Sequence, residues 1–188
     1  MIRANTLVPY KSWAKPLVSE VATIIYLLKD NGYDAAQLAK VTGLQQKNIN
    51  VWTARYKNEP DNLSSIPYPC WCFLCALVGK PNIQSNGDVI DVNVKKVLYY
   101  FKPTAFRSND KFICPSQEQF SNLIDNDNYE SLTTEKLSTV FNWNASNFAH
   151  GVENGSLPFL NWSLILMTLG IDIQKMILKD LEGDVSID

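Results

Sequence analysis

Apolar residues recur at helical spacing near the start of the chain, on one face of a helix that would follow Pro16. They are Leu17, Val21, Ile24, Ile25 and Leu28. Asn31 and Gly32 come next, as expected where a left-handed residue ends a helix. Asp34 then begins a shorter helix, because an acidic N-cap with Gln37 three residues later forms a capping box. The pattern predicts a buried core helix followed closely by a short one.

A segment with the pattern of a buried helix occurs twice. Residues 66–79 match residues 157–170 at a constant offset of 91, and most aligned positions keep their apolar character. Three pairs are identical: Pro67 and Pro158, Trp71 and Trp162, and Gly79 and Gly170. Pro at the start of a helix and Gly just after its end are typical positions for these residues. Each copy therefore predicts a buried closing helix.

Upstream of these segments the correspondence continues at an offset of 99. It pairs Leu38 with Leu137, Gly43 with Asn142, Leu44 with Trp143, and Ile49 with Phe148. The difference between the offsets falls in the polar loop 59–65, where an insertion is tolerated. We therefore predict two homologous units, roughly residues 13–83 and 116–178.

These units divide the chain into an amino-terminal domain of residues 1–84, a connector of residues 85–115 and a carboxy-terminal domain of residues 116–188. Within the connector, residues 89–101 alternate weakly in hydropathy. They fit either a short hairpin or a helix, and periodicity does not decide between the two.

Residues 35–52 meet the requirements of a helix-turn-helix motif. The small side chain of Ala39 lets two helices cross closely, and Gly43 permits the positive φ that a tight turn requires. A shared core would come from Leu38, Leu44, Ile49 and Trp52. The next helix, about residues 45–58, would then expose a polar face.

On these residues the chain resembles the XRE or phage-repressor-like helix-turn-helix family. The resemblance continues into the polar loop and the Pro-led closing helix, which is how the five-helix domains of this family usually end. It implies an all-α fold with two tandem, diverged lambda-repressor-like domains. It also implies a transcriptional regulator of phage, plasmid or other mobile-element type that binds double-stranded DNA sequence-specifically.

The second helix of the motif supplies the candidate DNA contacts. Gln and Asn can bond adenine through two hydrogen bonds, whereas Lys and Arg suit guanine or phosphate. The expected base contacts, clustered where this helix would enter the major groove, are Gln45, Gln46, Lys47 and Asn50. The expected phosphate contacts are Lys40, Arg55 and Lys57.

The second copy departs from the family pattern where DNA binding would be decided. Ser138 replaces the small Ala, Asn142 replaces the turn Gly, and Gly151 falls where Trp52 sits. Its weaker candidates for DNA contact include no permanently cationic side chain; they are Asn144, Ser146, Asn147 and His150. We therefore expect this copy to serve pairing or partner binding.

Charge supports the same division of tasks. The formal net charge is -2, but the chain up to Phe112 carries 14 Lys and Arg against 8 Asp and Glu, and the remainder carries 3 against 11. A basic half can neutralise DNA phosphates, while an acidic half is repelled by them. The asymmetry predicts DNA binding by the first half and a protein partner for the acidic second half.

Other chemistry is not expected. Cys70, Cys72, Cys75 and Cys114 suggest zinc ligands, but Asn161, Ser163 and Leu166 replace the first three in the second copy, so we expect no metal. The single His lies in no nucleophile motif, and no glycine loop that would cradle phosphate occurs, so we expect neither an enzyme nor a cofactor. Without a secretory signal or an apolar run near the roughly 20 residues of a membrane span, we expect a cytoplasmic protein.

Domains of this type usually act as dimers on half-sites about 34 Å apart. Either the chain forms a homodimer or its two copies form an internal pseudo-dimer, and the charge asymmetry favours a homodimer through the acidic unit. The rival hypothesis is a protein-interaction module on the same fold, such as an antitoxin, anti-repressor or accessory protein. A basic surface over the candidate cations would favour DNA; an apolar or acidic surface would favour a protein.

Overall fold

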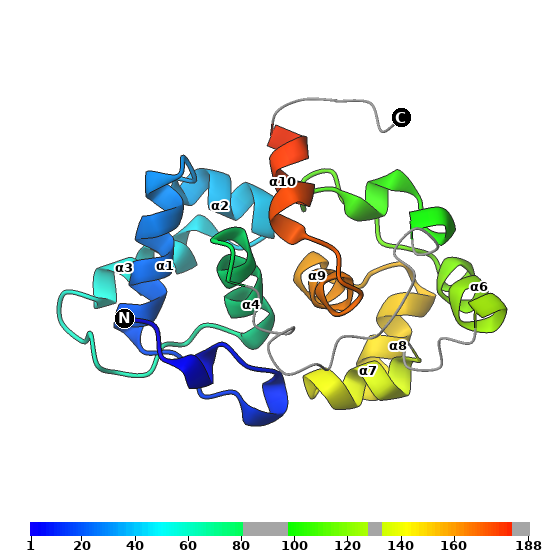
Figure 1. Ribbon diagram of the computed structural model, residues 1–188, viewed down its shortest axis with the longest axis horizontal. Helices are drawn as coiled ribbons and strands as arrows, with labels where there is room; N and C mark the ends of the chain where they lie inside the picture. Colours follow the sequence, from blue (N-terminus) through cyan, green and yellow to red (C-terminus); the bar gives the residue numbers. More distant parts are fainter. Residues whose placement is uncertain (81–97, 128–132, 182–188) are drawn as a thin grey trace.

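The computed structural model describes residues 1–80, 98–127 and 133–181, and these residues form helices without a strand (Figure 1). The first part contains η1 (Ala4–Thr6), η2 (Tyr10–Ser12), α1 (Val18–Asp30), α2 (Ala35–Thr42), α3 (Gln46–Arg55) and α4 (Tyr68–Leu77). The second contains η4 (Pro103–Phe106), α6 (Gln117–Asp127), α7 (Thr134–Phe141), α8 (Ala145–Glu153), α9 (Phe159–Thr168) and α10 (Ile173–Leu181). The predicted all-α class is confirmed over these residues.

In the described ranges, no helix combines the length and apolarity that crossing a membrane requires. Of residues 89–101, for which the pattern fitted a hairpin or a helix, only 98–101 are described, and residues 98–100 are helical.

The helices of the two halves begin at equivalent residues. α1, α2 and α3 start 99 residues before α6, α7 and α8, and α4 starts 91 residues before α9. These are the two offsets that the sequence comparison gave. The predicted duplication is therefore repeated in the secondary structure.

The turn after the second helix has the same backbone geometry in both halves. Gly43 follows α2 with φ 73°, and Asn142 follows α7 with φ 53°, so both are left-handed. Asn adopts this conformation more readily than most residues because its short polar side chain bonds locally. The replacement of Gly by Asn therefore preserves the turn.

Each half also includes a segment that precedes its first α-helix. The indole Nε1 of Trp71 donates to the carbonyl oxygen of Thr6 at 2.7 Å, and that of Trp162 donates to Ala105 at 2.6 Å. Thr6 and Ala105 are themselves 99 residues apart. The amide of Ala14 donates to the Asn5 carbonyl and that of Ile113 to the Thr104 carbonyl, again one offset apart. The repeat thus extends to a first unit of residues 3–80 and a second unit of residues 102–181, which includes residues 102–115 of the expected connector.

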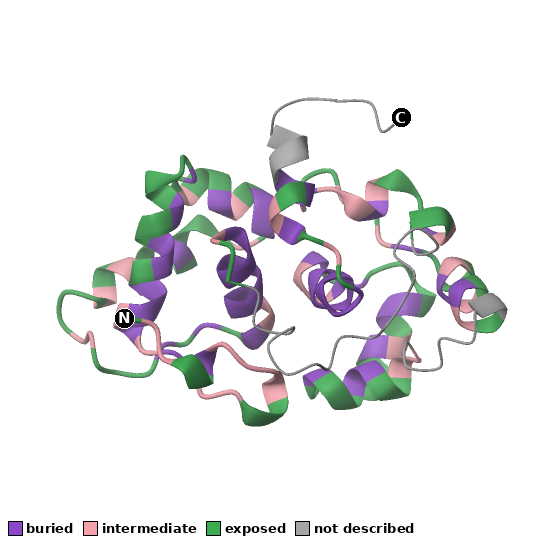
Figure 2. Cartoon of the chain, in the orientation of Figure 1, coloured by how far each residue is buried: buried purple, intermediate pink, exposed green. Residues whose placement is uncertain are grey.

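The closing helices α4 and α9 lie at the centre of the molecule and pack against each other (Figure 1). Both are almost wholly buried, as Figure 2 shows, and the rings of Phe73 and Phe159 meet at 5.4 Å. Trp71 and Trp162 are fully buried beside them. The two units therefore share one continuous core.

Candidate nucleic-acid interface

The turn between α2 and α3 is fixed by local hydrogen bonds. The amide of Gly43 donates to the Ala39 carbonyl at 2.9 Å, which closes α2. The hydroxyl of Thr42 donates to the Leu38 carbonyl at 2.6 Å and accepts from the amide of Leu44 at 3.2 Å. Because Thr42 is buried, these bonds hold the direction in which the chain enters α3.

One face of α3 anchors the helix to the first unit. Ile49 and Trp52 are buried, and the helix packs against α1 and α2. The indole of Trp52 also donates to the hydroxyl of Ser65 in the loop before α4 at 3.2 Å. The helix expected over residues 45–58 ends earlier, at Arg55, because the amides of residues 56–58 donate to carbonyls three residues before them instead of four.

The opposite face of α3 is open to solvent. The four predicted base contacts, Gln45, Gln46, Lys47 and Asn50, are all exposed. The N-cap residue Gln45 makes no side-chain capping bond, so its amide is not used to hold the helix.

Sequence reasoning missed Val51, which is half exposed on the same face of α3. An apolar side chain in a major groove can contact the methyl group of thymine. Its position one helical turn after Lys47 was the available signal, but an apolar residue is usually assigned to the core.

The predicted phosphate contacts differ in their surroundings. Nζ of Lys40 lies 3.2 Å from a carboxylate oxygen of Asp110, and Nη2 of Arg55 lies 2.6 Å from one of Glu59. Lys57 is exposed, and it makes no ion pair with any described residue. Lys40 and Arg55 would therefore have to exchange a carboxylate for a phosphate, whereas Lys57 would not.

Asp110 belongs to the second unit, so Lys40 joins the two units. Burial alone would raise the pKa of Asp110, but hydrogen bonds from Ser108 and Lys40 and the Lys40 charge lower it. The carboxylate therefore stays ionised beside Lys40. This partner comes from residues that the sequence analysis had placed in the connector.

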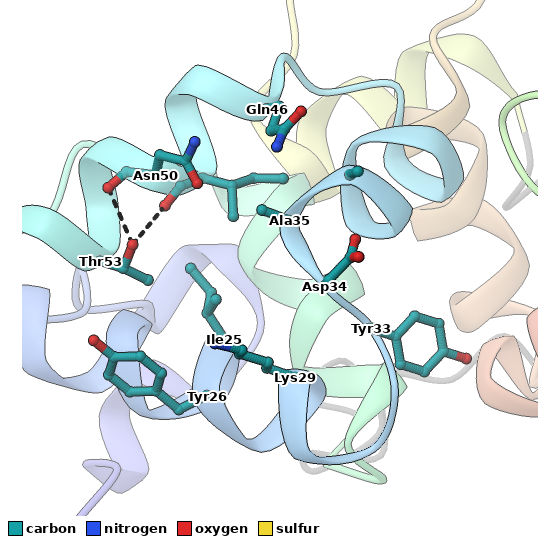
Figure 3. A pocket seen from close by; sticks show the side chains of 11 residues that line it. Ile25, Tyr26, Lys29, Tyr33, Asp34, Ala35, Gln46, Asn50 and Thr53 are labelled. Atoms are coloured by element: carbon teal, nitrogen blue, oxygen red, sulfur yellow. Dashed lines mark hydrogen bonds between the residues drawn. The ribbon is translucent and has the colours of Figure 1, made fainter.

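A cleft of about 320 Å³ opens between α1, the start of α2 and α3 (Figure 3). Gln46 and Asn50 line it from α3, facing Tyr26 and Lys29 of α1. Thr53 lies on the same side of α3, where its hydroxyl donates to the Asn50 carbonyl at 3.0 Å. Lys29 places a cation beside the candidate reading helix, and nothing in the sequence had linked it to α3.

The second unit presents a different face on α8. Ser146, Asn147 and His150 are exposed as expected, but the side chain of Asn144 caps the helix by accepting from the Asn147 amide at 2.9 Å. His150 Nδ1 lies 3.0 Å from Nδ2 of Asn154. The helix contains no Lys or Arg, and it ends on the exposed carboxylate of Glu153. Its chemistry does not match that of α3.

The cysteines lie in the core. Cys70, Cys72 and Cys75 are buried in α4, and burial raises the pKa of the Cys70 and Cys75 thiols. Within the described ranges, no group of three or more His, Cys, Asp or Glu side chains is placed to hold a metal ion.

Comparison of the chain with models of protein families, with curated proteins and with solved structures found no match. The family resemblance seen in residues 35–52 therefore stays a prediction.

Proposed function

We propose that the protein is a sequence-specific double-stranded DNA-binding regulator and that α3 reads the bases. One observation carries this proposal: the left-handed turn at Gly43 leads into a helix anchored by Ile49 and Trp52, whose outer face exposes Lys47 and Asn50. A helix held on one side and polar on the other is what docking into a major groove requires.

The side chains on this face suit base recognition. The amides of Gln46 and Asn50 can bond adenine, Lys47 can bond guanine, and Val51 can contact a thymine methyl group. Lys57 and Lys29 are cations that can neutralise phosphates beside the groove. No enzymatic step is part of the proposal.

The family resemblance supports the biological setting. It favours a transcriptional regulator of phage, plasmid or other mobile-element type, acting on DNA in the cytoplasm. The acidic second unit then serves pairing or partner binding rather than base reading.

A protein-interaction module is the second candidate, favoured by apolar exposure around α3. Tyr26, Val51 and Tyr56 are 43%, 50% and 42% exposed, and the rings of Tyr26 and Tyr56 meet at 6.4 Å. Two of the three predicted phosphate contacts are already paired with carboxylates. A protein partner would cover these aromatic rings, whereas DNA would use the polar residues beside them.

The test is binding to DNA fragments from around the protein's own gene, across a salt series. Lys47→Ala with Asn50→Ala should abolish preference among fragments, because each lost base contact removes about 1–3 kcal/mol of discrimination. Ser146→Ala with Asn147→Ala, on the uncharged face of α8, is the matched control and should bind as the wild type does.

Two results would contradict the proposal. Equal affinity of the wild type for all fragments would show that the protein does not bind DNA sequence-specifically. Selective binding that survives Lys47→Ala with Asn50→Ala would remove α3 as the reader. A protein partner that is captured by the wild type and lost on Tyr26→Ala with Tyr56→Ala would support the second candidate.

A further inference from the structure

The two units meet through equivalent surfaces. α4 packs on α9, and these helices correspond to each other in the repeat. Their contact is apolar and buried, and it includes the ring of Phe73 against that of Phe159. A surface that packs against its own counterpart is the mark of a two-fold interface.

The contacts beside this core are also reciprocal. The turn residue Gly43 lies against Asn109: a Cβ on Gly43 would be 2.5 Å from Oδ1 of Asn109. The equivalent turn residue Asn142 lies against Tyr10, to whose hydroxyl its Nδ2 donates at 3.1 Å. Tyr10 and Asn109 are also one offset of 99 apart. Each turn thus touches the same segment of the other unit.

Two further contacts join the same segments of the two units. The amide of Asn109 donates to the Val41 carbonyl at the end of α2, while α7 packs against η2, which contains Tyr10. In a homodimer such pairs would join two chains. Here they join two halves of one chain, so α3 and α8 occupy equivalent places.

We infer that the chain is an internal pseudo-dimer that binds DNA as a single copy, on a site with two unlike halves of which only one is read by side chains. The inference rests on the proposed function. Two-fold-related helices meet successive half-sites on one face of a duplex. In the inferred arrangement, α8 is the helix that would lie at the neighbouring half-site when α3 enters one groove.

The residues of α8 explain why its half-site is not read. At the positions of Gln46, Lys47 and Asn50, the second unit has Ala145, Ser146 and Ala149. Neither a bidentate amide nor a cation remains at these positions. The second half of the site therefore contributes little sequence information and little salt dependence. The homodimer favoured by charge alone is not needed for a two-part site.

The experiment installs the chemistry of α3 in α8 through Ser146→Lys with Ala149→Asn. The probe is the fragment selected by the wild type, with the α3 half-site present once or as an inverted repeat. The variant should bind the inverted repeat at least about tenfold more tightly than the single half-site, with a salt slope steeper by about one. Gln117→Lys, exposed at the start of α6, adds the same charge and should leave this preference unchanged.

Light scattering supplies the second readout. The free protein should have the mass of one chain, 21.3 kDa, and the complex should contain one chain per site. Two chains per site, or an α8 variant that folds with the wild-type melting temperature yet gains no preference, would overturn the inference. Absence of selective binding by the wild type would instead remove the proposed function, and a single-chain mass would still support the internal pseudo-dimer.

Discussion

Glu20 and Gln119 occupy equivalent positions but hold their units with different chemistry. The buried carboxylate of Glu20 accepts from the amide of Arg3 at 2.6 Å, from that of Leu17 at 2.7 Å and from the Arg3 guanidinium. Gln119 accepts from the Ser116 amide at 3.0 Å and donates to the Tyr100 carbonyl at 3.1 Å. One unit thus fixes its first segment with a charge and the other with a neutral amide.

This difference predicts a pH dependence of stability. Burial alone would raise the pKa of Glu20, but the hydrogen bonds from Arg3 and Leu17 and the Arg3 charge lower it below the ordinary value of 4.5. Its stabilisation is therefore complete above pH 4.5 and is lost as the pH falls through the lowered value. Glu20→Gln, which copies Gln119, should lower the free energy of unfolding by about 1–3 kcal/mol at pH 7 and by less under acid. Urea unfolding at pH 7 and in acid measures this, with exposed Glu118→Gln as control.

We predict that replacing Gly43 by any residue with a Cβ atom destabilises the protein. Gly43→Ala would place an L side chain at φ 73° and against Asn109, which should cost about 1–2 kcal/mol for the left-handed backbone and more for the contact. Adding Asn109→Ala to Gly43→Ala should restore only the part of the lost stability that is due to the contact with Asn109. Urea unfolding of the two single variants and the double variant separates these contributions. A Gly43→Ala protein as stable as the wild type would show that the turn is not constrained.

At the scale of the element, many of the helix boundaries could be predicted from the sequence, because they depend on nearby residues. The capping box of Asp34 and Gln37, and the Pro residues before α4 and α9, mark the helix starts that the structure has. The ion pair of Lys40 with Asp110 could not be predicted from the sequence, because its two residues lie far apart along the chain. The repeat of the segments before α1 and α6 was also hidden, since backbone carbonyls accept these bonds whatever the side chain.

The pair of Arg55 and Glu59 on the edge of the candidate interface gives a prediction of its own. Glu59→Gln releases the guanidinium, so DNA affinity should rise and the salt slope should steepen by about one. Asp61→Asn removes the same charge from an exposed residue without touching Arg55, and its effect should be smaller. Binding isotherms across a salt series measure both. Equal effects of the two substitutions would mean that Arg55 stays away from phosphate.

At the scale of the whole molecule, the shared core should make the two units unfold together. Phe73→Ala removes one side of the contact between α4 and α9 and should lower the free energy of unfolding by about 3–5 kcal/mol. Exposed Leu63→Ala should have little effect. Amide hydrogen exchange of α1 and α6 reports each unit separately. Loss of protection in α1 alone would show that the units are independent.

The reciprocal packing of the two units also affects how occupancy of a DNA site would depend on protein concentration. For a repressor that must first dimerise in solution, the occupancy of its DNA site rises with the square of the protein concentration when the protein is dilute. Small changes in concentration then change the occupancy sharply. Halves joined by one peptide chain find each other at any dilution. If the protein binds DNA as proposed, occupancy of its site should follow the first power of the protein concentration, and the response should be gradual. Because one gene encodes both units, each unit can accumulate substitutions and still have the other beside it. The different residues of α8 and α3 illustrate this divergence.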